Sequence, residues 1–253
     1  MNAPTPRTAV VTGAASGIGE GIALHLAGLG HRVAVVDRDG EGATRVAADI
    51  EAVGGRALAI TADVSDEHQV ELAVATAATE LGEIGILVNN AGFVRNVMLA
   101  DMATADWDDV VGTHQRGAFL FTRAVVAGMK RQGWGRIVNI SSISALGGLK
   151  RASYVSAKAG IEGFTKAVAH ELAADGITAN AIGPGVVVTG MTAAGAKEAG
   201  RTLDEHVAVL GQGVAVGRVG TPYDIARAVA FFTDDEADFI TGQVLYVSGT
   251  PHG

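Results

Sequence analysis

The sequence predicts an α/β protein in which a parallel sheet is covered by helices on both faces. Short runs rich in β-branched residues alternate with longer helical stretches along nearly the whole chain, which is typical of β-α-β units. Only residues 183–215 depart from this rhythm. Hydrophobic residues make up 48% of the 253 residues and charged residues 18%, so one large core is expected and the whole chain, 1–253, is predicted to fold as a single domain.

Seven strands and six main helices are expected. The strands are predicted at residues 9–11, 32–36, 57–61, 84–88, 136–140, 177–182 and 243–247. The helices are predicted near residues 17–29, 41–53, 66–81, 105–131, 152–174 and 222–233, with Ser65, Thr104 and Thr221 as capping residues. The segment of about 183–215 contains many small residues and a helix around 203–210. It is long enough to act as a lid over a substrate.

Composition and charge exclude several classes of partner. The net charge of −8 argues against a surface built for nucleic acid or for anionic membranes. Residues 1–7 are short and polar, no apolar run approaches the length of a membrane helix, and there is no cysteine. The protein is therefore expected to be cytoplasmic, with a small molecule as its substrate. Metal binding is not expected, because the histidines outside the candidate site are dispersed: His25, His31, His68, His170, His206 and His252.

A glycine-rich motif stands directly after the first predicted strand and directly before the first helix. Residues 12–19 read TGAASGIG, with Ser16 and Ile18 between the glycines. Gly13 permits a sharp turn, and Gly17 and Gly19 let the backbone come close to a pyrophosphate that the helix N-terminus attracts. A single glycine-rich turn is weak evidence, but this position favours dinucleotide binding.

Asp37 ends the second predicted strand, 18 residues after Gly19. A carboxylate at this place accepts both hydroxyls of an adenosine ribose and repels a 2′-phosphate, so it predicts NAD rather than NADP. Arg38 is the next residue and would favour NADP instead, because its side chain could pair with a 2′-phosphate. The simpler alternative is that both side chains are solvated at the end of a strand.

Polar residues also follow the third, fourth and fifth predicted strands. Asp63 and Val64 follow the third strand, Asn89-Asn90-Ala91-Gly92 the fourth, and Ser141-Ser142 the fifth. The carboxyl ends of parallel strands meet at one edge of the sheet, where ligands bind. Ordinary turns at strand ends are the alternative explanation for each of them taken alone.

The most informative pair is Tyr154 and Lys158, four residues apart in a stretch that favours a helix. This spacing places both side chains on one helix face. A free tyrosine has a pKa of about 10, and a nearby ammonium lowers it toward the range in which a phenol serves as an acid and base. We therefore expect Lys158 to lower the pKa of Tyr154. Ser142 stands 12 residues earlier and could hold a substrate oxygen.

Together these motifs resemble the classical short-chain dehydrogenase/reductase family over essentially the whole chain. The resemblance rests on TGAASGIG, Asp37, Asp63, the NNAG of residues 89–92, Ser142, Tyr154 with Lys158, Asn180 and the PGVVVT of residues 184–189. It implies a doubly wound Rossmann-type domain with strand order 3-2-1-4-5-6-7 and a bound nicotinamide. It also implies that Val187 and Thr189 hold the carboxamide and that Lys158 binds the nicotinamide ribose. The cofactor residues expected on this basis are Gly13, Ser16, Gly17, Ile18, Gly19, Asp37, Arg38, Asp63, Val64, Asn90, Ala91, Gly92, Tyr154, Lys158, Pro184, Gly185, Val187 and Thr189.

The sequence departs from the family pattern in two places. His114 stands where the family carries an asparagine that stabilises a helix kink and holds a water in a proton relay; a neutral imidazole could bind that water, or His114 could be structural. The loop between Ser142 and Tyr154 is one residue shorter than usual. Ser142 is therefore the first choice for the catalytic hydroxyl, with Ser141 and Ser144 as alternatives.

The expected function is NAD-dependent interconversion of a secondary alcohol and a ketone, with Ser142, Tyr154, Lys158 and His114 as catalytic residues. Candidate pocket residues such as Phe93, Leu149 and Val188 are mostly apolar. They favour a hydrophobic or cyclic alcohol, or a 3-hydroxyacyl thioester. The alternatives are an isomerase or lyase of the same family that retains the cofactor, and an NAD-sensing regulator without turnover. The resemblance also implies a homotetramer or a homodimer.

Overall fold

The computed structural model describes residues 5–251, which form one seven-stranded sheet with its covering helices. All strand pairs are parallel, and the order β3-β2-β1-β4-β5-β6-β7 confirms the predicted order. The strands are β1 (Thr8–Thr12), β2 (Arg32–Asp37), β3 (Arg56–Thr61), β4 (Ile84–Asn89), β5 (Gly135–Ile140), β6 (Ile177–Pro184) and β7 (Val244–Val247). The ends of the predicted single domain, and the predicted dispersed His252, lie outside the described residues.

Nine α-helices occur in the described part of the chain. They are α1 (Gly17–Gly28), α2 (Gly40–Ala52), α3 (Glu67–Leu81), α4 (Thr104–Val111), α5 (Gly117–Gln132), α6 (Ala152–Leu172), α7 (Gly190–Glu198), α8 (Leu203–Gly211) and α9 (Pro222–Thr233). No helix among residues 5–251 is long and apolar enough to cross a membrane.

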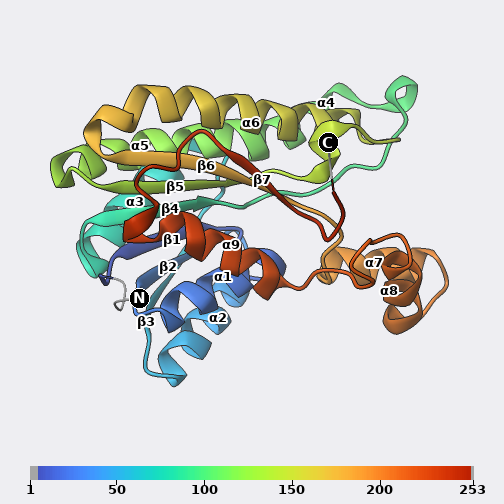
Figure 1. Cartoon of the computed structure of the whole chain (residues 1–253), viewed down its shortest axis with the longest axis horizontal. Coiled ribbons are helices and arrows are strands. Elements are labelled where there is room, and N and C mark those ends of the chain that lie inside the picture. The colour runs from blue at the N-terminus through green and yellow to red at the C-terminus, as the bar shows by residue number, and fades with distance from the viewer. Residues whose placement is uncertain (1–4, 252–253) are drawn as a thin grey trace.

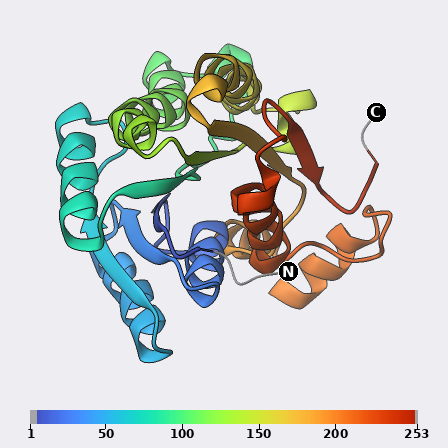
Figure 2. The ribbon, with the colours of Figure 1, turned by 60° about the vertical axis from the view of Figure 1, so that its left-hand side comes forward.

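Helices cover both faces of the sheet (Figures 1 and 2). An apolar cluster fills the space between the sheet and the helices on each face. On β1, Ala9 and Val11 belong to one cluster and Val10 to the other, as the alternation of side chains along a strand requires. The first cluster lies under α1, α2 and α9, and the second under α3, α5 and α6. This double packing explains why β1, β4, β5 and β6 are buried from end to end.

The single helix predicted over 105–131 is in fact two helices. A short π-helix, Gly112–Arg116, separates α4 from α5. The interruption turns the buried His114 toward the centre of the molecule, where its ring contacts Tyr154 of α6. A turn of this kind is common at functional sites and leaves no signature in hydrophobic spacing.

Helix N-termini also differ from the prediction. Thr221 caps α9 as expected, with its side chain accepting a hydrogen bond from the Asp224 amide. Ser65 does not cap α3, because the carboxylate of Asp66 accepts from the Gln69 amide. Thr104 is the first residue of α4 rather than its cap.

The predicted lid segment contains two helices, α7 and α8, instead of one. They stand out from the rest of the ribbon at one end of the molecule (Figure 1). Gly200, with φ of +65°, lies between them in a conformation that favours glycine. α7 consists mainly of small residues, which is why the sequence pattern indicates only the more hydrophobic α8.

Candidate active site

The predicted site residues converge at the carboxyl edge of the central strands. The glycine-rich loop follows β1, residues 90–92 follow β4, Ser142 follows β5, and residues 185–189 follow β6. β1 and β4 are neighbours in the sheet although β2 and β3 intervene in the sequence. Their junction is the point where the strand order reverses, and doubly wound sheets bind ligands there.

The glycine-rich loop is packed against the loop that follows β4. Gly13 has φ of +63°, and a Cβ atom there would lie 2.7 Å from Cα of Ala91. The Thr12 hydroxyl oxygen accepts from the amides of Asn90 (3.0 Å) and Ala91 (3.1 Å). The Asn90 side chain donates to the carbonyls of Thr12 (2.8 Å) and Gly13 (3.0 Å). Asn90 thus braces the loop, and Thr12 is a partner that the sequence analysis missed.

The N-terminus of α1 is open to an anion. Ser16 precedes the helix without a side-chain hydrogen bond to it, so no side chain among the described residues caps the first amides. Gly17 has φ of +60°, and the side chain of Ile18 packs on the first apolar cluster. Gly19 has no room for a side chain, because a Cβ atom would collide with the Gly13 carbonyl. These features fit a pyrophosphate above the helix N-terminus.

Asp37 is fixed beside this loop. Its carboxylate accepts from the amide of Ala15 (3.0 Å) and from the amide of Asp39 (3.0 Å). Arg38 is exposed. The geometry therefore presents the carboxylate, held by backbone amides, next to the glycine-rich loop.

Asp63 and Val64 lie at the same edge in different environments. Asp63 is exposed and its carboxylate accepts from the amide and hydroxyl of Ser65, which is the turn geometry considered as the alternative. Val64 is buried, and a Cβ atom at Gly117 of α5 would lie 2.8 Å from its side chain.

The segment after β6 closes over the glycine-rich loop. Thr189 is the N-cap residue directly before α7, and its side chain would be 3.3 Å from a Cβ atom at Gly17. Val187 is buried and pairs with Gly220 in a bridge. Gly185 has no space for a side chain, since a Cβ atom there would lie 2.7 Å from Cα of Ser248. Pro184, the last residue of β6, is buried. The structure thus brings two motifs together that are 170 residues apart in the sequence.

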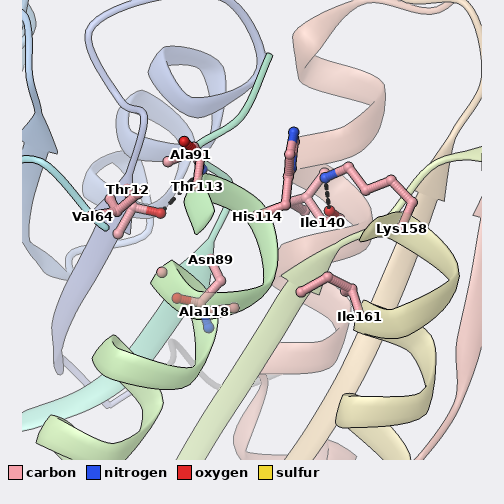
Figure 3. Close-up of a pocket in the computed structure, with 11 residues that line it drawn as sticks. Thr12, Val64, Asn89, Ala91, Thr113, His114, Ala118, Ile140, Lys158 and Ile161 are labelled. Carbon is pink, nitrogen blue, oxygen red and sulfur yellow. Dashed lines mark hydrogen bonds between the residues drawn. The ribbon is translucent and has the colours of Figure 1, made fainter. Parts of the chain in front are cut away.

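Tyr154 and Lys158 lie one turn apart at the start of α6. The Lys158 ammonium is 5.6 Å from the centre of the Tyr154 ring. It donates a hydrogen bond to the Ile140 carbonyl at 2.6 Å (Figure 3). Burial lowers the pKa of Lys158 to about 7, because a charged amine is costly to desolvate.

The three candidate serines have different surroundings. The Ser142 side chain acts on Tyr154 and lowers the pKa of the phenol, against the effect of burial. Its hydroxyl oxygen also accepts from the amide of Ser144 (3.1 Å). Ser141 instead donates to Glu162 (2.8 Å), a partner that the sequence analysis missed. Ser142 is therefore the hydroxyl that the structure places beside the phenol.

The expected cause of tyrosine acidity is not observed in this structure. Burial raises the pKa of Tyr154, while the hydrogen bond from Ser142 and the positive charge of Arg151 act in the opposite direction. Lys158 faces the Ile140 carbonyl, and its own charge is disfavoured by burial. Helical spacing says nothing about desolvation, so the lowering of the Tyr154 pKa by Lys158 stays a prediction.

His114 is held in a defined orientation. Its Nε2 atom lies 2.9 Å from the carbonyl oxygen of Phe93 and 3.2 Å from the Phe93 amide. The shorter distance favours a proton on Nε2 that is donated to the carbonyl. Burial, followed by the charge of Lys158, lowers the pKa of His114 to about 3, so the ring is neutral at pH 7. Its Nδ1 atom is buried and has no hydrogen-bond partner among the described residues.

A small cavity of about 10 Å³ lies beside this ring (Figure 3). Its lining includes Thr12, Asn89, His114, Ile140 and Lys158. The volume is close to the minimum that holds one water, and the polar lining provides partners for it. No group of three potential metal-ligating side chains is found among residues 5–251.

Known proteins with the same architecture are similar to this chain over nearly its full length. The family model described as enoyl-(acyl carrier protein) reductase matches residues 13–250. The short-chain reductase protein NovJ of Streptomyces niveus is 42% identical over 241 residues, which are 95% of this chain and 92% of that protein. The 3-oxoacyl-(acyl-carrier-protein) reductase FabG of Staphylococcus aureus is 40% identical over 245 residues, 96% of this chain and 97% of that protein.

A similar solved structure is that of a candidate NAD(P)-dependent gluconate 5-dehydrogenase from Beutenbergia cavernae with bound NADP at low occupancy. It has a TM-score of 0.87 and 36% identity, and the alignment covers 96% of this chain and 95% of that chain.

The fold and the site define an oxidoreductase of the doubly wound α/β class. The similar sequences then identify the family within this class. The chain belongs to the short-chain dehydrogenase/reductase family.

Proposed function

We propose that the protein is an NAD(H)-dependent oxidoreductase that interconverts a secondary alcohol and a ketone. One observation carries this proposal. Tyr154 lies at the sheet edge that also holds the glycine-rich loop, the Ser142 side chain acts on its pKa in the direction that favours the phenolate, and Lys158 is buried one turn further along α6. A proton-exchanging group thus stands next to the expected cofactor site, which is the arrangement that hydride transfer to or from a carbinol carbon requires.

The chain offers a consistent set of groups for NAD. The amides at the start of α1 hold the pyrophosphate, and Asp37 accepts the ribose hydroxyls. When bound, the nicotinamide supplies the hydride acceptor or donor. By resemblance to the family, Asp63 and Val64 flank the adenine, Asn90 to Gly92 lie along the ribose side, and Val187 and Thr189 hold the carboxamide. The choice of NAD over NADP is supported by the Asp37 carboxylate beside Ala15, because a 2′-phosphate there would meet a negative charge.

The proton steps are assigned to this chain's own side chains. Ser142 binds the substrate oxygen, and Tyr154 removes the proton of the hydroxyl group in the oxidation direction and returns it in the reduction direction. Lys158, with a pKa of about 7, exchanges protons near neutral pH and binds the nicotinamide ribose. The Nδ1 atom of His114 accepts a hydrogen bond from one water in the cavity that Lys158 also lines. His114 thereby takes the place of the asparagine expected by family resemblance.

Apolar residues near Ser142 support a substrate with a hydrocarbon part. Leu146 and Leu149 are 60% and 78% exposed on the loop that joins Ser142 to α6. We retain the predicted hydrophobic or cyclic alcohol, or a 3-hydroxyacyl thioester, as the substrate. Residues 183–215, with α7 and α8, act as the lid in this proposal. The homotetramer or homodimer and the cytoplasmic location stay predictions.

The decisive variant is Tyr154→Phe. It removes only the hydroxyl group, so NADH binding, followed by cofactor fluorescence, is expected to stay unchanged. Turnover of a ketone, followed by NADH absorbance, is expected to fall by at least about two orders of magnitude, the usual contribution of a proton-transfer residue. Near-normal turnover in Tyr154→Phe would overturn the assignment.

A panel of alcohols and ketones tests the reaction class itself. A dehydrogenase changes NADH absorbance with at least one member of the panel. An isomerase or lyase of the family converts its substrate without a net change in absorbance, and a regulator binds NADH without any turnover.

A further inference from the structure

We propose that the rim of the active site binds a carboxylate of the substrate through Arg151 and Lys150, so that the substrate is a hydroxy or oxo carboxylic acid. This inference rests on the proposed oxidoreductase function and, of the substrates considered there, favours a hydrophobic alcohol or ketone that also carries a carboxylate over the thioester. The carboxylate is separate from the alcohol or ketone carbon that reacts.

Arg151 is held in place at the entrance of α6. It directly precedes the helix, three residues before Tyr154. Its Nε atom donates to the side-chain oxygen of Asn96 at 3.0 Å. The amide of Val97 donates to the Lys150 carbonyl at 2.8 Å, and Val97 and Arg151 form a bridge. The loops after β4 and before α6 therefore join at the rim, and the two Nη groups of Arg151 remain available for a ligand.

No acidic side chain neutralises these two cations in the described part of the chain. None of the ion pairs within residues 5–251 involves Lys150 or Arg151. Arg95 on the neighbouring loop is different, because it pairs with Asp106 at 3.3 Å. The protein carries 27 acidic and 19 basic residues. Two adjacent cations without an acidic partner are thus a local positive patch on an acidic protein.

The backbone of Lys150 has a left-handed conformation that usually favours glycine, yet the chain has a lysine at this position. Lys150 has φ of +61° and is the only residue other than glycine with a positive φ within residues 5–251. The left-handed conformation is unfavourable for a residue with a Cβ atom. Gly147 and Gly148 are nearby, so the loop has glycines elsewhere and places a lysine at the strained position. Strain of this type is found preferentially at functional sites.

The position of Arg151 connects the patch to the reacting groups. Its charge is close enough to Tyr154 to favour the phenolate. Arg151 directly precedes α6 and stands three residues before Tyr154, so an anion that it binds is held near the helix turn that carries the proposed proton-transfer group. The planar guanidinium pairs with a carboxylate through two parallel hydrogen bonds. The exposed Leu149 next to Lys150 provides an apolar surface for the carbon chain between the carboxylate and the ketone.

The test compares Arg151→Gln with the wild-type protein on matched substrates. The probes are straight-chain 3-, 4- and 5-oxo carboxylates and their methyl esters, which carry the same ketone without the charge. For at least one chain length, the wild type is expected to favour the acid over the ester by tenfold or more in kcat/KM. Arg151→Gln is expected to reduce this preference at least tenfold, mainly through KM, and Arg151→Lys is expected to keep part of it.

Arg95→Gln is the control, because it removes a cation of the same rim that already has an acidic partner. Its acid-to-ester ratio is expected to change less than twofold. If the wild type reduces esters or other neutral ketones but Arg151→Gln leaves the ratio unchanged, the carboxylate site is refuted and the oxidoreductase function stands. If the wild type reduces no ketone, the proposed function fails. Titration of the NADH-bound protein with the same oxo acids then shows separately whether Arg151 is needed for binding.

Discussion

Asp37 has two tasks that can be separated by substitution. Its carboxylate accepts a hydrogen bond from the Ala15 amide, which shapes the glycine-rich loop, and in our proposal its charge repels a 2′-phosphate. Asn at this position keeps an acceptor for the Ala15 amide and removes the charge, whereas Ala removes both.

We expect Asp37→Asn to shift the ratio of kcat/KM values for NADH and NADPH toward NADPH by about tenfold or more, because one charged interaction contributes about 1.5–3 kcal/mol. Asp37→Ala is expected to shift the ratio in the same direction and to weaken binding of both cofactors. Steady-state kinetics with the two cofactors measure both effects. An unchanged ratio in both variants would remove the argument for NAD.

At the residue scale, the positions of the site residues could be predicted from the sequence, but the shifts of their pKa values could not. The spacing of Tyr154 and Lys158 correctly predicted that both residues lie in one helix, about one turn apart, because four residues make about one helical turn. The pKa of Tyr154 depends on its burial and on Arg151, and neither is visible in the spacing of a pair. The choice among Ser141, Ser142 and Ser144 also needed the structure, since the shortened loop obscured the register.

At the scale of elements, the π-helix links the loop after β4 to the site. A Cβ atom at Gly92 would collide with the imidazole of His114. Gly92 therefore belongs to the NNAG motif for a packing reason: it provides the space into which the π-helix directs the ring. Neither the glycine nor the histidine alone predicts this contact, because the hydrophobic pattern of 105–131 is continuous.

This contact predicts a coupled effect on stability. Gly92→Ala is expected to lower the free energy of unfolding by about 1–3 kcal/mol, the usual range for overpacking. In a His114→Ala background the same substitution is expected to cost less than about 0.5 kcal/mol, because the colliding ring is gone. Urea denaturation of the four proteins of this cycle measures the coupling. Equal costs in both backgrounds would show that the ring and the glycine are not in contact.

At the scale of the whole molecule, the alternation of strands and helices was sufficient to predict seven strands, and the family resemblance implied their order, which the structure confirms. The topology of a parallel sheet is robust because each crossover is right-handed and each strand is buried on both faces. The helices of residues 183–215, the segment predicted to act as a lid, were less predictable. Residues 190–198 contain small residues whose helix is not supported by an apolar face, so only α8 was expected.

The buried histidine makes the stability of the whole protein depend on pH. His114 has a pKa of about 3 in the folded protein and an ordinary value of 6.5 when unfolded. The unfolded chain therefore binds more protons below pH 6.5, and the free energy of unfolding falls as the pH decreases from 6.5 toward 3. At pH 5 the loss due to this one group is about 2 kcal/mol. Burial lowers the pKa values of His25 and His31 as well, and both add to the loss.

We expect the free energy of unfolding of His114→Asn to fall less steeply with decreasing pH than that of the wild type. The variant lacks the one proton that His114 binds on unfolding. Urea denaturation at pH 7.5, 6.0 and 5.0, at one protein concentration, gives the slope for each protein. His170→Asn, at an exposed position, is the matched control and is expected to keep the wild-type slope. The slope is the informative quantity, because any change in packing caused by asparagine shifts all three values equally. A wild-type slope in His114→Asn would mean that His114 binds protons equally in the folded and unfolded states, and the lowering of its pKa by burial would be refuted.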